Sequence, residues 1–181
     1  MDHGADRRIA LLIAILALFL AVAETVAKSA QTEAISRNVE AANLWAFFQA
    51  RSIRQTTVRT AAEAAEWDRL AAVEDAVRNA IARQQQAWRD SAQRWESEPA
   101  TGEGRRELMA RAKAAEAKRE RSLAAYHLYE FGSAAFQVGI VLASASIITT
   151  VPALALGAVV LGVVGLGLTA LGFVAPEAVH F

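Results

Sequence analysis

Residues 132–176 read GSAAFQVGIVLASASIITTVPALALGAVVLGVVGLGLTALGFVAP and contain no Asp, Glu, Lys or Arg. A helix of about 20 apolar residues is long enough to cross the hydrocarbon of a bilayer. The stretch has room for two such crossings, and Pro152, which follows Thr149 and Thr150, allows only a tight turn between them. The sequence therefore predicts two antiparallel transmembrane helices over residues 131–150 and 151–175, followed by a tail of residues 176–181.

Small side chains recur at intervals of three and four along both predicted spans. Small residues let two helices approach closely in lipid, where packing drives association. A close seam is therefore expected between the two helices. Its predicted packing residues are Gly139, Ala158, Gly162, Gly165 and Gly172. Gln137, the most polar side chain of the pair, is expected to form a hydrogen bond between helices.

A third apolar segment, residues 9–27, follows two arginines near the N-terminus. Its length matches the hydrocarbon thickness, which predicts a transmembrane helix after a tail of residues 1–8. The alternative is a cleaved signal peptide, because Ala21-Val22-Ala23 fits the small-x-small cleavage pattern. Glu24 lies in the last turn of this span, four residues before Lys28. These two side chains are expected to form an ion pair at the membrane interface.

Most charged residues lie between Lys28 and Phe131, where 17 of the 19 basic and 15 of the 19 acidic residues occur. Alanine, glutamate, glutamine and arginine dominate this block, and all of them favour helices. The chain has no glycine or proline from Ala5 to Glu98. The chain is therefore predicted to be all-α, with an extramembrane helical region over residues 28–130. Its near-balance of charge gives no indication of a nucleic-acid partner, and the absence of cysteine excludes disulfides and thiolate chemistry.

The extramembrane region is predicted to form an antiparallel, coiled-coil-like hairpin of two helices, residues 58–98 and 105–130. A turn at residues 99–104 is expected to close the hairpin, because it holds a proline and two glycines. The helical stretch before this turn is much longer than the stretch after it. A bend is therefore expected at residues 54–57, where two β-branched threonines weaken the helix.

An aromatic, amphipathic segment, residues 43–54, precedes the expected bend. It suits the membrane interface or the groove of a partner, and the alternative is that its aromatic side chains form the core of the hairpin. A second apolar stripe at helical spacing runs from Trp67 to Trp95. The predicted interaction residues are Trp45, Phe47, Phe48, Arg51, Arg54, Trp67, Trp88 and Trp95.

Residues 38–54 read NVEAANLWAFFQARSIR. This stretch resembles the Trp-x-aromatic-aromatic-Gln-Ala-basic-x-aliphatic-basic signature of a bacterial membrane family, the domain of unknown function four-three-three-seven. The resemblance extends to the layout of the chain, with one span, a charged helical block and a paired span. It implies this architecture and no activity. Family members carry a basic cluster between the last two spans, which implies a cytoplasmic turn, whereas Thr149-Thr150-Val151-Pro152 stands there in this chain.

The sequence holds no pattern typical of catalysis or phosphate binding. His127 and Glu130 share a helix face, but a carboxylate-bridged bundle site needs Glu-x-x-His motifs, which are absent. His3 and His180 lie in the terminal tails and indicate no site. No enzymatic activity, metal, cofactor or small-molecule substrate is therefore expected.

The leading hypothesis is a membrane-anchored structural or interaction protein that self-associates or serves as an accessory subunit of a larger membrane complex. The alternative is a small oligomeric channel or transporter, which the glycine-rich spans and Glu24 favour. The chain is expected to be a multi-pass protein of the bacterial inner membrane. The arginines before the first span predict an N-terminus in the cytoplasm and a helical region in the periplasm. A count of the basic residues just before the second span favours the opposite orientation.

Overall fold

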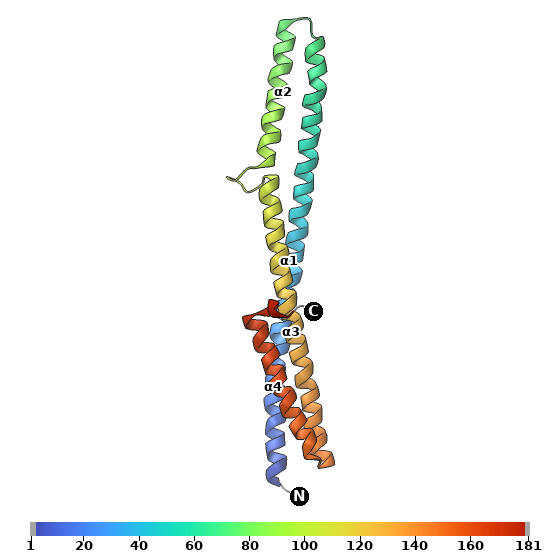
Figure 1. Ribbon diagram of the computed structural model, residues 1–181, viewed down its shortest axis with the longest axis vertical. Helices are drawn as coiled ribbons and strands as arrows, with labels where there is room; N and C mark the ends of the chain where they lie inside the picture. Colours follow the sequence, from blue (N-terminus) through green and yellow to red (C-terminus); the bar gives the residue numbers. More distant parts are fainter. Residues whose placement is uncertain (1–2, 180–181) are drawn as a thin grey trace. The chain divides into compact units, whose positions relative to one another are not determined.

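The computed structural model describes residues 3–179, and within them the regular elements are all helical. Figure 1 shows the elements in chain order. The four long helices and one short 3-10 helix are α1 (His3–Ala71), α2 (Asp75–Glu96), α3 (Arg105–Thr149), α4 (Pro152–Val174) and η1 (Pro176–Ala178). The expectation of an all-α chain is confirmed for this range. The predictions for His180 and for the ends of the two tails lie outside the described residues.

The chain divides into two compact units, and α1 and α3 contribute to both of them. The first unit, called here the apolar unit, contains the chain up to residue 36 and from residue 118 onward. The second unit, called here the hairpin unit, contains residues 37–117.

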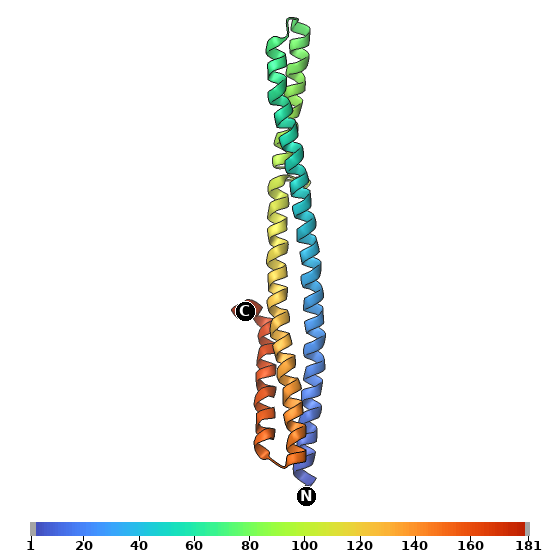
Figure 2. The same ribbon diagram turned by 90° about the vertical axis from the view of Figure 1, so that its right-hand side faces the viewer.

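The apolar unit packs α1, α3 and α4 side by side. Leu16 and Ala23 of α1 and Phe136 of α3 form a buried cluster, and the Phe19 and Phe136 rings stack with centroids 6.1 Å apart. Figure 2 shows the tight connection after which α4 returns along α3. Thr150 makes this reversal with a φ of 56°, a left-handed conformation that is uncommon for a residue with a side chain. The antiparallel pair predicted from the sequence is therefore present.

Three helices, α1, α3 and α4, each contain a stretch long and apolar enough to cross a membrane, judged by length and composition. The side chains that face away from the three-helix packing are mostly aliphatic, and they include Leu18, Val141, Leu156 and Val163. These aliphatic side chains suit contact with lipid. The backbone also suits a bilayer, because its hydrogen bonds are satisfied within each helix.

The hairpin unit differs from the sequence prediction in the position of its turn. α1 continues without a break through residues 54–57, so the bend expected there is wrong. The turn lies at residues 72–74, which also divides the single helix expected over residues 58–98. Arg78 of α2 stabilises the turn, because its Nη2 donates to the Ala72 carbonyl at 2.9 Å and its Nη1 pairs with Asp75. This guanidinium satisfies a carbonyl that the end of α1 leaves without a helical partner.

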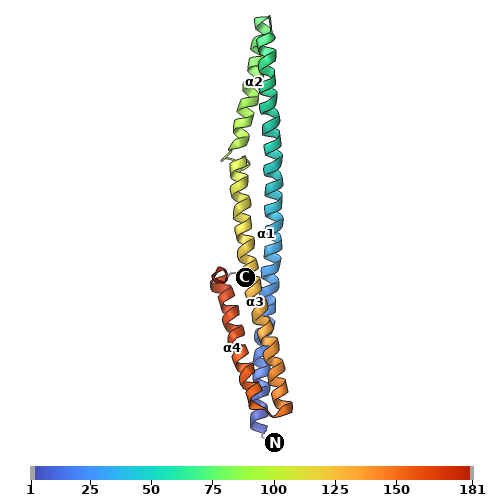
Figure 3. The same ribbon diagram turned by 45° about the vertical axis from the view of Figure 1, so that its right-hand side comes forward.

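The proline- and glycine-containing segment does not close the hairpin, which corrects a second prediction. Residues 97–104 join α2 to α3, and Figure 3 shows α2 and the first turns of α3 following one another along α1. α1 contributes 35 residues to the hairpin unit, residues 37–71, and α2 together with residues 105–117 contributes the same number. The length mismatch that suggested a bend therefore disappears, because two helices in series face one long helix.

The segment between α2 and α3 is held by Glu107, which lies in the first turn of α3. Its carboxylate accepts hydrogen bonds from the Ser97 hydroxyl at 2.6 Å and from the Glu98 amide at 3.2 Å. Gly104 lies so close to this segment that a Cβ atom there would come within 2.7 Å of the Ser97 Cα. Gly102 has a φ of 68°, so both glycines serve this connection and neither serves a hairpin turn.

A comparison of two glycines in α4 tests the close packing of the apolar unit. A Cβ on Gly165 would lie 2.8 Å from the Phe136 ring and 3.0 Å from the Gly132 carbonyl, whereas a Cβ on Gly167 would meet nothing within 4 Å. We expect Gly165→Ala to lower the free energy of unfolding by about 1–3 kcal/mol, because the added methyl group overpacks the seam. Thermal unfolding of the full chain in mild detergent, followed by circular dichroism, measures the difference. Gly167→Ala is the matched control, and an equal loss in both variants would contradict the assignment of the seam.

Candidate functional site

The aromatic segment of α1 packs into the hairpin unit. Ala41 and Leu44 are buried with three residues of α3, Leu108, Ala112 and Ala115, and Trp45, Phe47 and Phe48 pack against this cluster. The Trp45 Nε1 donates a hydrogen bond to the Glu116 carboxylate at 2.8 Å, and the Trp45 and Phe48 rings meet edge to face. Of the two interpretations of residues 43–54, these contacts support the one in which the aromatic side chains form part of the core.

Two arginines lie over the aromatic rings of this segment. Arg51 lies 5.3 Å from the centre of the Phe47 ring and forms a 2.7 Å ion pair with Glu103, in the segment that precedes α3. Arg105 lies 5.1 Å from the centre of the Phe48 ring. These guanidinium groups therefore join α1 to the beginning of α3. Arg54, the other predicted interaction residue here, is exposed.

A buried hydrogen-bond network connects α1 and α2 at two equivalent places. The Gln55 amide donates to the Ala92 carbonyl at 2.8 Å and to the Glu96 carboxylate at 3.0 Å. In the reciprocal set, the Gln85 amide donates to the Ala62 carbonyl at 2.8 Å and to the Glu66 carboxylate at 3.1 Å. Both glutamine side chains are buried, so their amides would be costly to leave unpaired. We call these contacts the glutamine network.

The glutamine network reflects an internal repeat that the sequence analysis missed. Residues 55–66 read QTTVRTAAEAAE and residues 85–96 read QQAWRDSAQRWE, so Gln, Arg, Ala and Glu recur at the same four positions. The glutamine, alanine and glutamate of each copy make the reciprocal contacts described above. A comparison of the chain with itself at an offset of 30 residues would have found this signal.

The electrostatics of the network favour ionised carboxylates. Hydrogen bonds from Arg69 and then from Gln85 lower the pKa of Glu66 from its ordinary value of 4.5 to about 2. The hydrogen bond from Gln55, aided by the charges of Arg105 and Arg106, lowers the pKa of Glu96. Arg105 also donates to the Gln55 side-chain oxygen at 2.6 Å, so one arginine supports both partners of that set.

The face of α1 opposite the glutamine network carries exposed apolar side chains at regular intervals. Val39, Ile53 and Trp67 are 54%, 67% and 76% exposed, and each is 14 residues from the next. An interval of 14 is two heptads, so the three side chains lie in one row along a coiled-coil helix. We call this row the exposed stripe. Trp88 and Trp95 of α2, also predicted to interact, are partly buried.

The apolar unit contains one polar pair between two helices. The Gln137 amide of α3 donates to the Glu24 carboxylate of α1 at 3.3 Å, which is the interhelical bond expected of Gln137. Among the described residues Glu24 makes no ion pair with Lys28, so that expectation is wrong. Both side chains line a polar cleft of about 490 Å³ together with Lys28, Gln31 and Glu130.

The four small residues of α4 predicted for packing, Ala158, Gly162, Gly165 and Gly172, are buried. Gly162 faces Leu16 of α1, and Gly172 faces the ring of Tyr129. In α3, a Cβ on Gly139 would lie 3.3 Å from the Ala158 carbonyl. The structure therefore brings these residues together in one unit. No group of three or more His, Asp or Glu side chains suited to a metal ion occurs within residues 3–179.

Comparison with known proteins gives one match. The profile of a family described as a domain of unknown function (DUF4337) matches residues 5–175. No curated protein and no solved structure matches the chain significantly.

Adjacent glutamines in α2 test the glutamine network. Gln85 is buried and its amide bonds to α1, whereas Gln86 is exposed and its amide bonds to Asp90 of its own helix. We expect Gln85→Ala to lower the free energy of unfolding by about 1–3 kcal/mol, because it removes the two hydrogen bonds that the buried amide donates to the Ala62 carbonyl and the Glu66 carboxylate. Gln86→Ala should change it by less than about 0.5 kcal/mol. Thermal or chemical unfolding of the full chain in detergent gives both values, and similar effects in the two variants would argue against the network.

The lowered pKa of Glu66 predicts a loss of stability in acid. Since the folded pKa lies below the unfolded value, the carboxylate contributes its full stabilisation above about pH 4.5 and loses it as the pH falls toward about 2. The melting temperature of the wild type should therefore fall through this interval. Glu66→Gln should show a smaller fall, whereas Glu63→Gln, an exposed change on the same helix, should keep the slope of the wild type. An unchanged slope in Glu66→Gln would refute this contribution.

Proposed function

Because the chain belongs to the DUF4337 family, whose description assigns no activity, we propose its role from its surfaces: it is a membrane-anchored interaction protein that self-associates through the hairpin unit. The proposal includes no enzymatic activity, no cofactor, no nucleic-acid partner and no small-molecule substrate. As an accessory subunit of a larger membrane complex, the chain would bind its partner through the same surface of the hairpin unit.

The observation that carries the proposal is the exposed stripe. Val39, Ile53 and Trp67 expose large apolar surface to water, at an interval that matches a coiled-coil seam. Such a row is unfavourable in an isolated hairpin, because each of these side chains gains about 1.5–3 kcal/mol when it is fully buried. A second copy of the chain offers an identical row, and two such rows related by a two-fold axis bury one another.

The three apolar helices support anchoring in a membrane. Their length and composition suit three crossings, which would put the N-terminus on one side and the segment between α1 and α3 on the other. We propose a bacterial inner membrane with the N-terminus in the cytoplasm and the hairpin unit in the periplasm. The two arginines before the first apolar segment support this orientation.

The polar cleft at Glu24 and Gln137 supports association within the membrane as well. Ionisable side chains at membrane depth are usually directed to the interior of a bundle or to a water-filled space. A second copy packed over the cleft would provide such an interior. The same cleft favours the alternative function, a small oligomeric channel or transporter. Ion conductance by the reconstituted protein, lost in Glu24→Gln, would favour that alternative.

Polar substitution of the exposed stripe tests self-association. We expect the wild type in mild detergent to have a mass of at least two chains, and Ile53→Gln with Trp67→Gln to weaken association by about tenfold or more, since two apolar anchors are lost. Light scattering or native mass spectrometry over a range of concentrations measures the change. Both side chains are exposed, so the circular dichroism of the chain should not change.

The matched control is Arg59→Gln with Asp68→Gln, two exposed changes on the flanks of the same helix that leave the net charge unaltered. This variant should associate like the wild type. A wild type that remains monomeric at every concentration would overturn the proposal, and so would an Ile53→Gln, Trp67→Gln variant with undiminished association.

A further inference from the structure

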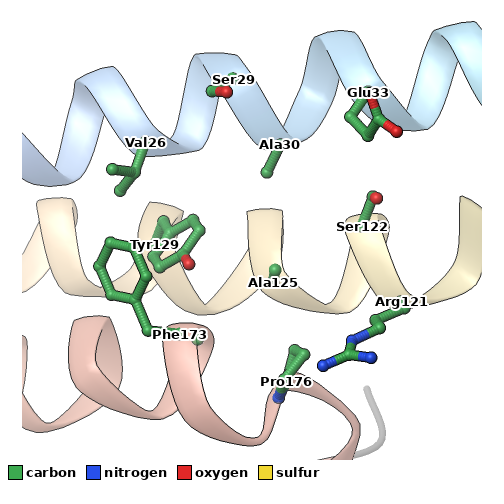
Figure 4. A pocket seen from close by; sticks show the side chains of 11 residues that line it. Val26, Ser29, Ala30, Glu33, Arg121, Ser122, Ala125, Tyr129, Phe173 and Pro176 are labelled. Atoms are coloured by element: carbon green, nitrogen blue, oxygen red, sulfur yellow. The ribbon is translucent and has the colours of Figure 1, made fainter. Parts of the chain in front are cut away.

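A pocket of about 450 Å³ lies between α1, α3 and the end of α4 in the apolar unit. Figure 4 shows it from close by. α1 contributes its upper wall, α3 lies in the middle, and α4 with η1 forms the lower wall in this view. Its lining includes Val26, Ser29, Arg121, Ser122, Tyr129 and Phe173.

The pocket is apolar at one end and polar at the other. The Tyr129 and Phe173 rings lie 5.2 Å apart and form the apolar end with Val26. Arg121 and Ser122 lie at the other end, two helical turns earlier on α3 (Figure 4). The charge distribution along the chain explains this polarity, because α3 has no charged residue after Glu130 and α4 has none along its length. The pocket therefore lies where the charged part of α3 meets its apolar part.

Among residues 3–179, Arg121 provides a guanidinium that is not neutralised by an ion pair. Within the described part of the chain its guanidinium makes no ion pair, and Figure 4 shows it directed toward Pro176 and away from Glu33 on the opposite wall. The hydroxyl groups of Ser29 and Ser122 also have no hydrogen-bond partner among the described residues. One guanidinium and two hydroxyl groups are donors suited to a phosphate, whose oxygens accept charge-assisted hydrogen bonds.

We propose that this pocket binds the headgroup of a glycerophospholipid, with its phosphate on Arg121 and an acyl chain along Phe173 and Val26. The inference rests on the membrane anchoring proposed above. A lipid phosphate lies at the boundary between water and hydrocarbon, which is the depth that the charge pattern of α3 assigns to Arg121. Tyrosine is favoured at the same depth because its ring is apolar and its hydroxyl is polar. A free phosphate would use Arg121 and leave the aromatic end of the pocket unfilled.

Native mass spectrometry of the full chain in mild detergent, titrated with dioleoyl phosphatidylethanolamine, tests the proposal. We expect one lipid per chain to be retained, and Arg121→Gln to weaken retention about tenfold because one charge-assisted interaction is lost. Arg121→Lys should recover most of the affinity. Lys118→Gln removes the same charge from an exposed position outside the pocket and should retain lipid like the wild type.

Equal retention in Arg121→Gln and the wild type would overturn the lipid site, as would an equal loss in Arg121→Gln and Lys118→Gln. Inorganic phosphate should not displace the lipid, and displacement at equal concentration would identify a simple phosphate site instead. Flotation of the protein with carbonate-washed vesicles separates this test from the proposed function. A chain that fails to float refutes membrane anchoring and the lipid site together. A chain that floats but retains lipid regardless of Arg121 refutes the lipid site alone.

Discussion

The hairpin unit depends on two buried glutamines that fix the register between α1 and α2. An alanine-rich antiparallel pair can slide by a heptad at little cost in packing, because its small side chains look alike at every layer. The amides of Gln55 and Gln85 remove this freedom, since each reaches a particular carbonyl and a particular carboxylate on the opposite helix. A shifted register would leave these buried amides unpaired, so only one alignment satisfies all of them. The position of the turn at residues 72–74 then follows.

In the apolar unit, close packing at glycines aligns the helices. Its helices gain little from hydrophobic burial if lipid surrounds them, so they depend on close contact. Glycines provide that contact where the ring of Phe136 or Tyr129 occupies the space of the missing side chain. Hydrogen bonds from buried glutamines thus align the helices of the hairpin unit. Close packing of aromatic rings against glycines aligns the helices of the apolar unit.

Composition predicted the helices and the apolar segments but misplaced the hairpin turn. Charge-free residues 132–176 and the run without glycine or proline are local signals, and they predicted α3 and α4 correctly in outline. For α1 they predicted helix but not its length, because a break was expected at residues 54–57 and α1 ends at Ala71. The turn at residues 72–74 contains no glycine or proline, whereas residues 99–104 contain both, so local rules favoured the wrong place. Contacts between α1 and α2 determine where the helix ends. Gln55 is buried against α2, and this contact keeps residues 54–57 helical despite their threonines. The pocket at Arg121 joins three separated segments, and no local pattern predicts it.

The repeat in residues 55–66 and 85–96 has a consequence for how chains can combine. Each copy carries both the donor and the acceptors of the network, so the two copies are complementary to one another wherever they meet. If two molecules opened at residues 72–74 and traded α2 together with the chain that follows it, every hydrogen bond of the network would form again across the dimer. Such a domain-swapped pair would need no bond that the single chain lacks, and the short loop would act as the hinge.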